Sequence, residues 1–239
     1  ENTLTSRPTD IIAGFPVRPG FFELNGATPL SNGVNFTAHT RHGTSCELLL
    51  FHSGEEEPFA VLPFPNACRI GDVYSMIVMG LDIEDLEYGY RIDGPYEPEK
   101  GHIFDKTKVL LDPYAKAVAG QREWGQQKIG SYHARVVRDS FDWEDMPQST
   151  RKISDLIIYE LHVRGFTQDS SSGVMHPGTF AGFREKIPYL KELGINAVEL
   201  MPIFEFDENM NARTVNGKRL LEYWGYNSVN FFSPNTSYA

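Results

Sequence analysis

A change of pattern near residue 150 limits the folds open to this chain of 239 residues more than any other feature. Residues 1–94 contain short runs of strand-forming residues separated by turn residues, with no stretch of helical periodicity. After residue 152, two apolar runs enclose a single amphipathic helical segment. The first pattern is typical of a β-sandwich and the second of an α/β fold, so we expect two domains of different classes.

Short apolar runs predict the strands of the first domain. The run at 34–38 alternates apolar and polar residues, as a strand with one buried face requires. The run at 46–51 is apolar almost throughout and ends at a turn. Two further strands are predicted at 73–78 and 88–92. Several short strands with turns between them favour a β-sandwich, which we place in residues 1–110.

Residues 111–152 are expected to form an ordered connector rather than a loose linker, because they contain several large aromatic side chains. Within this segment, residues 115–119 predict a short helical turn. Trp124 and Trp143 are expected to pack between the two domains, since large aromatic side chains are most stable when they are buried.

The second half predicts a strand, a helix and a second strand. Residues 156–163 form a mostly apolar run, as expected of a strand that is covered on both faces. Thr179 is placed to cap a helix with one apolar face, Pro188 to kink that helix, and Gly194 to end it. Residues 195–201 then form the second strand. Strands joined in this way are parallel and belong to an α/β fold.

Composition and charge argue against two classes of function. The formal net charge is -10 and no basic cluster is present, which argues against nucleic acid as a partner. No apolar run reaches the length of a membrane helix, so no membrane-spanning segment is predicted. Cys46 and Cys68 lie in no metal-ligand spacing and are interpreted as reduced thiols of a cytosolic protein.

Three motifs in the second half resemble segments of the α-amylase superfamily, glycoside hydrolase family thirteen. Residues 159–167 (YELHVRGFT) resemble its first barrel strand, and residues 194–202 (GINAVELMP) resemble its second. Residues 223–227 (YWGYN), continuing through 231–234 (FFSP), are similar to the segment that leads into the third strand. That last motif is typical of isoamylase-type and bacterial glycogen-debranching enzymes.

Two motifs in the first half support the same resemblance. Residues 88–96 (YGYRIDGPY) and 110–115 (LLDPYA) resemble the N-terminal, carbohydrate-binding-type β-sandwich of those enzymes, which is immunoglobulin-like. The segment 204–222 looks closer to the bacterial enzymes than to the plastid enzymes of plants.

The resemblance therefore implies a β-sandwich in residues 1–110, a connector in 111–152, and the start of an incomplete (β/α)8 barrel in 153–239.

The resemblance also implies an enzyme that hydrolyses α-1,6 branch linkages of glycogen or starch with retention of configuration. In this family, three carboxylates act from the ends of the fourth, fifth and seventh barrel strands, and a complete barrel takes about 250 residues. Only 87 residues remain from 153 to 239. No catalytic residue is therefore assigned in this chain, and the chain alone is expected to be inactive.

Tyr226 is the one residue to which the resemblance gives a functional role. It matches the tyrosine that stacks on the sugar ring at the cleavage point, and is assigned to substrate binding. An aromatic face packs well on the apolar face of a pyranose. Trp224 is expected to be structural. His162 and Arg164 are expected to order the first barrel strand by hydrogen bonding rather than to border the sugar cleft.

Acidic residues near the strand ends are not assigned to catalysis. Glu160 and Glu199 match positions of the strand motifs that do not carry the family's catalytic acids. These two residues and Glu205 are interpreted as structural or solvated. Glu205, Asp207 and Glu208 offer the hard oxygen ligands that calcium takes. Because an acidic loop is usually solvated, neither a metal site nor a cofactor is predicted there.

The expected partner is thus a branched α-glucan such as glycogen, amylopectin or a limit dextrin. The expected location is the cytoplasm of a bacterium, or the plastid if the source is a plant or an alga. Two alternatives stay open: a branching enzyme or pullulanase relative, and a non-catalytic glucan-binding or regulatory protein. The motif at 223–227 together with Ser233-Pro234 favours an isoamylase-type enzyme over the first alternative. The sequence beyond Ala239 decides the second, because a non-catalytic protein requires that the three carboxylates be absent there.

Overall fold

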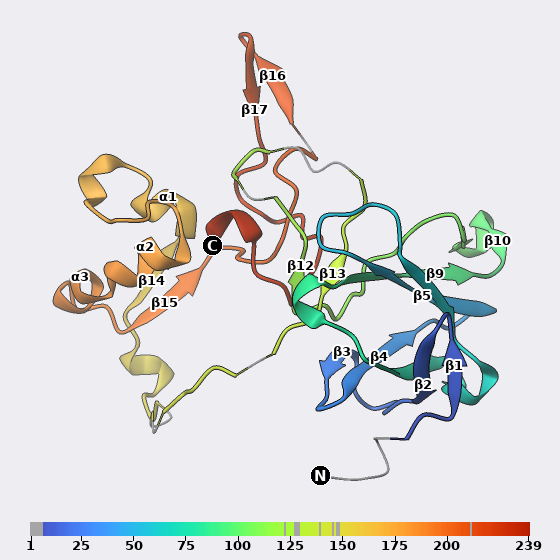
Figure 1. The fold of residues 1–239 in the computed structure, drawn as a ribbon. Helices are drawn as coiled ribbons and strands as arrows, with labels where there is room; N and C mark the ends of the chain where they lie inside the picture. Colours follow the sequence, from blue (N-terminus) through green and yellow to red (C-terminus); the bar gives the residue numbers. More distant parts are fainter. Residues whose placement is uncertain are drawn as a thin grey trace. The chain divides into compact units, whose positions relative to one another are not determined.

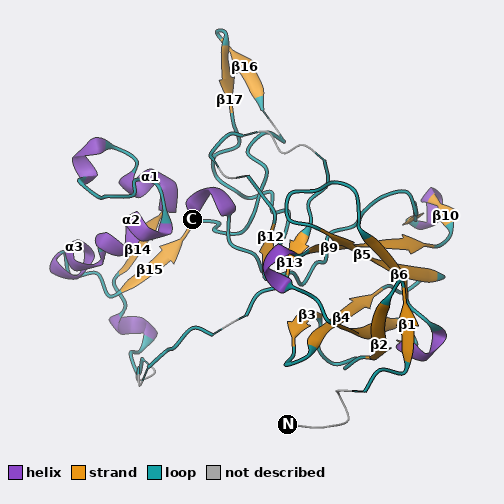
Figure 2. Cartoon of the chain, viewed as in Figure 1, coloured by secondary structure: helices purple, strands orange, loops and turns teal. Residues whose placement is uncertain are grey.

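The structure is a computed structural model that describes residues 7–121, 123–126, 130–138, 140–144, 146, 149–210 and 212–239 (Figure 1). The chain divides into two compact units. Residues 1–119 and 128–138 form the first, here called the sandwich unit, and residues 120–127 and 139–239 form the second, here called the parallel-strand unit. Strands dominate the sandwich unit, whereas the α-helices belong to the parallel-strand unit (Figure 2).

Two antiparallel sheets make up the sandwich unit. Within the described residues, the first sheet has the order β1-β2-β8-β4-β3 with β7 paired to β8, and the second has the order β12-β13-β9-β5-β6. The first sheet contains β1 (Asp10–Ile12), β2 (Phe15–Pro19), β3 (Gly26–Pro29), β4 (Gly33–His39), β7 (Arg69–Ile70) and β8 (Val73–Met79). The second contains β5 (Ser45–Phe51), β6 (Ala60–Pro63), β9 (Glu87–Asp93), β12 (Ala117–Val118) and β13 (Ala134–Arg135). Outside these sheets are β10 (Tyr96–Glu97), β11 (His102–Ile103), and the 3-10 helices η2 (Asn66–Cys68), η3 (Ile83–Asp85) and η4 (Pro98–Lys100).

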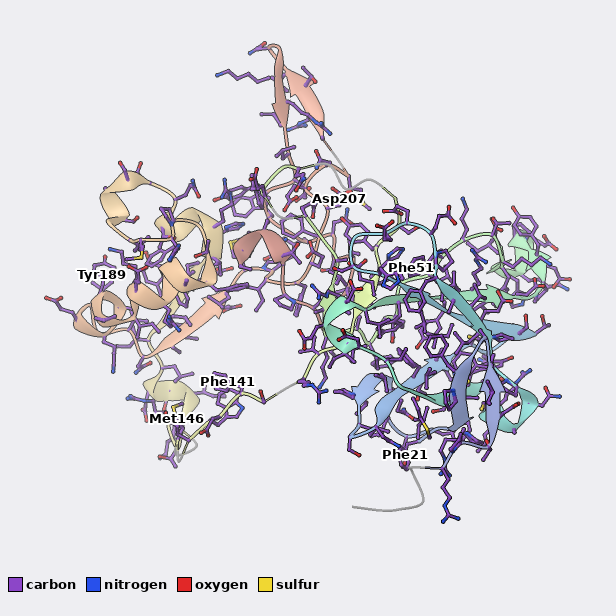
Figure 3. All side chains as sticks on the ribbon, in the orientation of Figure 1. Phe21, Phe51, Phe141, Met146, Tyr189 and Asp207 are labelled. Atoms are coloured by element: carbon purple, nitrogen blue, oxygen red, sulfur yellow. The ribbon has the colours of Figure 1, made fainter. Side chains whose placement is uncertain are left out.

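The core of the sandwich unit is built from alternate residues of both sheets. Val34 and Phe36 of β4 join Leu48 and Leu50 of β5 in one buried cluster. Burial of one such side chain stabilises the fold by about 1.5–3 kcal/mol, so this shared core holds the sheets together. Phe51, the last residue of β5, is also fully buried (Figure 3).

The strands expected from the sequence of the first half are confirmed to within one residue at each end. The runs at 34–38, 46–51, 73–78 and 88–92 correspond to β4, β5, β8 and β9. The alternation of small turn segments and apolar runs was sufficient to place these central strands, and the expected β-sandwich is present.

Both cysteines are free and belong to the core of the sandwich unit. Burial raises the pKa of the Cys46 thiol to about 12, with a further contribution from the nearby charge of Glu47. Burial likewise raises the pKa of Cys68, to about 11, with a smaller contribution from Asp10. Both side chains therefore stay thiols at neutral pH and pack as small apolar groups.

The segment expected as a connector, 111–152, is shared between the two units. The helical turn predicted at 115–119 is wrong, because this segment contains β12 instead. The backbone N–H of Ala119 donates to the carbonyl of His133 at 2.8 Å, and Val118 is buried. Pairing with β13 and burial against the sandwich core outweigh the weak helical preference of the sequence.

The parallel-strand unit contains the expected parallel pair. Strands β14 and β15 pair in parallel, with Ile158 opposite Ala197 and Leu161 opposite Leu200. The strands and α-helices of this unit are β14 (Ile158–Leu161), α1 (Val163–Thr167), α2 (Phe180–Glu185), α3 (Ile187–Glu192), β15 (Ala197–Leu200), β16 (Arg213–Val215) and β17 (Lys218–Leu220). Its 3-10 helices are η5 (Ile153–Asp155), η6 (Ser170–Ser172) and η7 (Thr236–Tyr238).

The helical segment between the parallel strands has the predicted boundaries but is divided in two. The Thr179 hydroxyl accepts a hydrogen bond from the Gly182 N–H at 3.1 Å and so caps α2. Pro188 lies in the first turn of α3, where a proline is well tolerated, and the helix breaks at Lys186 instead of bending. Gly194, with a φ of +90°, follows the end of α3 as expected. In the part of the chain that the structure describes, no helix has the length and apolar character needed to cross a membrane.

A buried carboxylate ties a turn of the sandwich unit to its second sheet. Glu87 is 3% exposed and accepts hydrogen bonds from His133 Nδ1 at 3.2 Å and from the Gly54 N–H at 3.0 Å. The ring of Phe51 stacks on His133, with 3.8 Å between the ring centroids. Burial raises the pKa of Glu87, but the hydrogen bonds from His133, Gly54 and Ser53 outweigh it, so the pKa lies below its usual value.

We expect Glu87→Ala to lower the free energy of unfolding of the sandwich unit by about 3 kcal/mol at neutral pH, because it leaves buried donors without their acceptor. The pKa of Glu87 is lower in the folded state than in the unfolded state. Its contribution to the free energy of unfolding is therefore present above the unfolded-state pKa and is lost as the pH falls through the folded-state pKa. The difference between wild type and variant should therefore shrink in acid, as measured by urea unfolding followed by circular dichroism. Glu57→Ala is the control, because Glu57 is exposed and lies close in the sequence to Gly54, which donates to Glu87. Equal stabilities of the two variants at pH 7 would contradict the prediction.

Candidate functional site

The candidate site lies at the carboxyl end of the parallel strands. His162 follows β14 directly and Met201 follows β15. The carboxyl ends of parallel strands are where α/β proteins place their ligand sites. The side chains considered below belong to the parallel-strand unit.

A cluster of rings is centred on His162 and Tyr223. The His162 ring is 8% exposed and stacks on the Tyr223 ring, with 4.2 Å between centroids and an interplanar angle of 10°. Trp124 meets Tyr223 edge-on at 6.1 Å and stacks parallel to Tyr238 at the same centroid distance. The Arg164 guanidinium lies 4.6 Å from the centroid of the Trp124 ring. These contacts join segments that are far apart in the sequence into one aromatic cluster.

Both ring nitrogens of His162 are engaged. Nδ1 accepts a hydrogen bond from the Gly165 N–H at 3.0 Å, which caps α1, so Nδ1 carries no proton. Nε2 lies 2.8 Å from the carbonyl oxygen of Tyr223 and must donate its proton to it. Burial lowers the pKa of His162, the hydrogen bond to Tyr223 opposes this, and the charge of Arg164 lowers it further. His162 is therefore neutral, with its proton on Nε2.

The residues 223–227, here called the aromatic loop, contain three exposed aromatic residues, of which Tyr223 is the least exposed. Tyr226 is 72% exposed and Trp224 is 53% exposed. Gly225 between them has a φ of +80°, and a Cβ at this position would lie 2.9 Å from the Phe206 ring. Only glycine fits here, because the backbone is left-handed and lies directly on a buried ring. The aromatic loop is thus held tightly on one side while the Tyr226 ring stays accessible.

The acidic stretch after β15 is not the solvated loop that the sequence suggested. Glu205 and Glu208 are both fully buried. One oxygen of Glu205 accepts from the Thr236 N–H at 2.9 Å, and one oxygen of Glu208 accepts from the Ser237 hydroxyl at 2.9 Å. Asp207 (labelled in Figure 3) accepts from the Asn209 N–H at 2.8 Å. A solvated loop is wrong for both glutamates, because the chain near residues 233–238 folds over them. For Glu205 this leaves the structural role, which was the other expectation.

Within the described residues, no group of three or more His, Cys, Asp or Glu side chains has an arrangement that could hold a metal ion. Burial raises the pKa of Glu205 to about 7, against partial compensation by its hydrogen bonds to Thr236. A carboxyl group in this state is protonated in part at neutral pH. Glu160 and Glu199, which face each other in the register of β14 and β15, are exposed.

Sequence reasoning missed the role of the two residues that frame the cluster. Trp124 was expected to pack between domains, but its described ring contacts are with Phe206, Tyr223 and Tyr238 inside the parallel-strand unit. Tyr238 was not singled out at all, although its side chain is fully buried. Trp143 is 70% exposed and meets the exposed ring of Phe141 edge-on at 4.9 Å.

Glu205→Gln should remove a pH dependence from the stability of the parallel-strand unit. The pKa of Glu205 is raised from 4.5 to about 7 in the folded state. The contribution of its protonated carboxyl group to the free energy of unfolding is therefore fully present below pH 4.5 and is lost as the pH rises through about 7. Between pH 4.5 and pH 8 the wild type should therefore lose about 3 kcal/mol that the variant retains. Urea unfolding at a series of pH values measures this difference. Glu192→Gln, an exposed glutamate of α3, is the control, and a wild-type slope that Glu205→Gln leaves unchanged would refute the prediction.

Comparison with known proteins supports the resemblance that the sequence motifs indicate. Residues 25–115 match the profile of a family described as carbohydrate-binding module 48, the isoamylase N-terminal domain. Isoamylase 1, chloroplastic, of Arabidopsis thaliana is 38% identical over 90% of this chain and 29% of its own length. A glycogen debranching enzyme of Salmonella typhi is 33% identical over 90% of this chain and 34% of its own length. These relatives confirm the resemblance to isoamylase-type debranching enzymes, and the chain spans about three tenths of their length.

Solved structures share the fold. Pullulanase type I of Bacillus subtilis in complex with maltose is matched with a TM-score of 0.66 at 24% identity, over 92% of this chain and 29% of that one. The apo pullulanase of Paenibacillus barengoltzii is matched with a TM-score of 0.67 at 21% identity, over 91% of this chain and 32% of that one. At such identities the likeness extends to the fold alone.

The preference for a bacterial type of enzyme, drawn from segment 204–222, gains no support from the overall identities. Over the chain as a whole, the chloroplastic isoamylase of Arabidopsis thaliana is more similar than the Salmonella typhi enzyme, at 38% against 33%.

Proposed function

We propose that this chain is the N-terminal part of an isoamylase-type glycosidase that hydrolyses α-1,6 branch linkages in glycogen or starch with retention of configuration. The observation that carries the proposal is the similarity over nine tenths of the chain to isoamylases and glycogen debranching enzymes. The motifs at 159–167, 194–202 and 223–227 occur in the order in which those enzymes carry them.

The parallel-strand unit is proposed to be the start of a (β/α)8 barrel within residues 153–239. The parallel pairing of β14 with β15, through a helical crossover, supports this assignment. A retaining glycosidase needs two carboxyl groups about 5–5.5 Å apart, and in this family they stand on later strands. We assign no catalytic residue in this chain and propose that the remaining strands of a longer protein supply them.

Tyr226 is proposed to stack on the sugar ring at the cleavage point. Its ring is exposed, it follows a glycine that lies on the buried Phe206 ring, and the aromatic loop is anchored to the end of β14 through His162. An aromatic ring held in this way offers a flat apolar face to a pyranose while leaving the sugar hydroxyls free.

The sandwich unit is proposed to bind the branched α-glucan, with residues 1–110 as its main part and 111–152 as the connector; the alternative is that it only braces the barrel. The match of residues 25–115 to a carbohydrate-binding family supports this role. For the location we propose the cytoplasm, or the plastid in a plant or alga, in agreement with two buried free thiols and with relatives named chloroplastic.

A non-catalytic glucan-binding protein is the second candidate. It is favoured by one observation, the match of residues 25–115 to a carbohydrate-binding family. The 239-residue chain alone should release no reducing ends from amylopectin, because the parallel pair is too small to carry the catalytic carboxylates of later strands. A longer protein that contains this chain should release them. Release of reducing ends by the 239-residue chain, after contaminating enzyme is excluded, would refute the proposal that the catalytic carboxylates lie outside it. Inactivity of the longer protein would favour the non-catalytic candidate.

Tyr226→Ala, made in the longer protein, should lower kcat/KM on amylopectin by about tenfold or more. The reason is the loss of an aromatic face that buries against the sugar, since about 1.4 kcal/mol corresponds to tenfold. Tyr226→Phe retains the ring and should stay within about threefold of wild type. Reducing-end assays across substrate concentrations measure both. Equal kinetics for the alanine and phenylalanine variants would show that the ring does not contact the substrate.

A further inference from the structure

We propose that His162 is a positioning residue that holds the aromatic loop, and with it Tyr226, at the end of β14 by donating the Nε2 proton to the Tyr223 carbonyl. The inference rests on the proposed function, since it gives the loop its sugar-stacking role. It goes beyond that function because it assigns a role to a histidine that does not itself reach the substrate.

The anchor consists of two contacts on the same residue. His162 Nε2 lies 2.8 Å from the Tyr223 carbonyl oxygen, and the two rings stack at 4.2 Å. Trp224, the next residue, meets the His162 ring edge-on at 6.4 Å. Tyr223 is three residues before Tyr226, so the backbone is fixed immediately before the exposed ring.

Histidine suits this position because it combines two hydrogen bonds, which fix the aromatic loop, with a ring contact that adds to them. The residue accepts from the Gly165 N–H, donates to the Tyr223 carbonyl, and offers a flat face to the Tyr223 ring. The neutral imidazole with its proton on Nε2 has all three. Glutamine has the donor and the acceptor but no ring, and phenylalanine has the ring but neither polar atom.

Two glycines indicate that the aromatic loop is closely packed against its neighbours. A Cβ at Gly165 would meet the Tyr223 hydroxyl, so the start of α1 must be glycine for the ring to lie where it does. On the other side, Gly225 lies on the Phe206 ring. The aromatic loop is therefore confined between the end of β14 and the buried Phe206 ring. We expect that no other hydrogen bond replaces the one from His162 to Tyr223 when it is lost.

The groups that face His162 make the anchor sensitive to acid. Arg164 of α1 is a permanent cation, Tyr223 belongs to the aromatic loop, and the Tyr238 hydroxyl of η7 lies 3.3 Å from Nε2. Protonation of Nδ1 would break the bond from Gly165 and place a second positive charge beside Arg164. The protonated ring keeps its bond to the Tyr223 carbonyl but presents a second donor to the Gly165 N–H, so the ring must turn away from α1 and shift the aromatic loop with it. A glutamine at this position has no such response to acid.

The test compares His162→Gln with His162→Phe in the longer protein that contains this chain. For His162→Phe we expect KM on amylopectin to rise by about tenfold with kcat within about twofold, because the Tyr223 carbonyl loses its donor. For His162→Gln we expect KM within about threefold of wild type at pH 7. The wild type should show a rise of KM in acid that His162→Gln lacks. Circular dichroism and urea unfolding verify that each variant is folded.

Two outcomes would overturn the proposal. One is a KM for folded His162→Phe within twofold of wild type, and the other is an acid-dependent KM that persists unchanged in His162→Gln. Should His162→Phe not fold, the pH profile of His162→Gln decides alone.

A double-variant cycle separates this proposal from the proposed function. In a Tyr226→Ala background, His162→Phe should have no further effect on KM, because both changes act through the same ring. If Tyr226→Ala itself leaves kcat/KM unchanged, the sugar-stacking role fails, and the anchor is then judged on the 239-residue chain. There, nitrogen NMR of the His162 side chain, assigned by its loss in His162→Gln, should show the proton on Nε2 at neutral pH. A proton on Nδ1 would overturn the anchor whatever the kinetics show.

Discussion

Packing around Tyr238 is the interaction on which the parallel-strand unit depends. Its buried ring stacks on Trp124 at 6.1 Å and meets Phe180 edge-on at 5.8 Å and Phe206 at 6.4 Å. A two-stranded sheet cannot bury enough apolar surface to be stable by itself. The rings supply that surface from segments spread over more than a hundred residues, and the same packing places His162 and the aromatic loop. The candidate site is therefore a product of the unit's core and not an addition to its surface.

The strands that could be predicted from the sequence are those whose own pattern of apolar residues defines them. In β4 and β5 the apolar residues recur at every second position or fill the run, so a slip by one residue would expose the core face. Thr179 and Gly194 carry the local signals for the start and end of a helical segment. The exposed Tyr226 was also within reach, because a motif in the sequence resembles a known sugar-binding segment.

The rest depends on partners far away in the sequence. Nothing in residues 115–119 shows that residues near 134 will pair with them, so a strand looked like a helical turn. Glu205 and Glu208 looked solvated because acidic runs usually are, yet the chain around residue 236 covers them and supplies their hydrogen-bond donors. Whether these carboxyl groups are buried is decided by a segment that is distant in the sequence, and a local pattern does not contain that information.

The two thiols inside the sandwich core have a consequence for how the molecule can be studied. Cys46 and Cys68 are buried, and both have pKa values far above neutrality, so neither is a nucleophile while the sheets remain packed. A thiol reagent can reach them only when the sandwich opens. The rate at which a thiol reagent modifies them thus measures how often the sandwich unit opens. The parallel-strand unit contains no cysteine, so changes in that unit do not contribute to this rate. The chain carries its own built-in reporter of local unfolding.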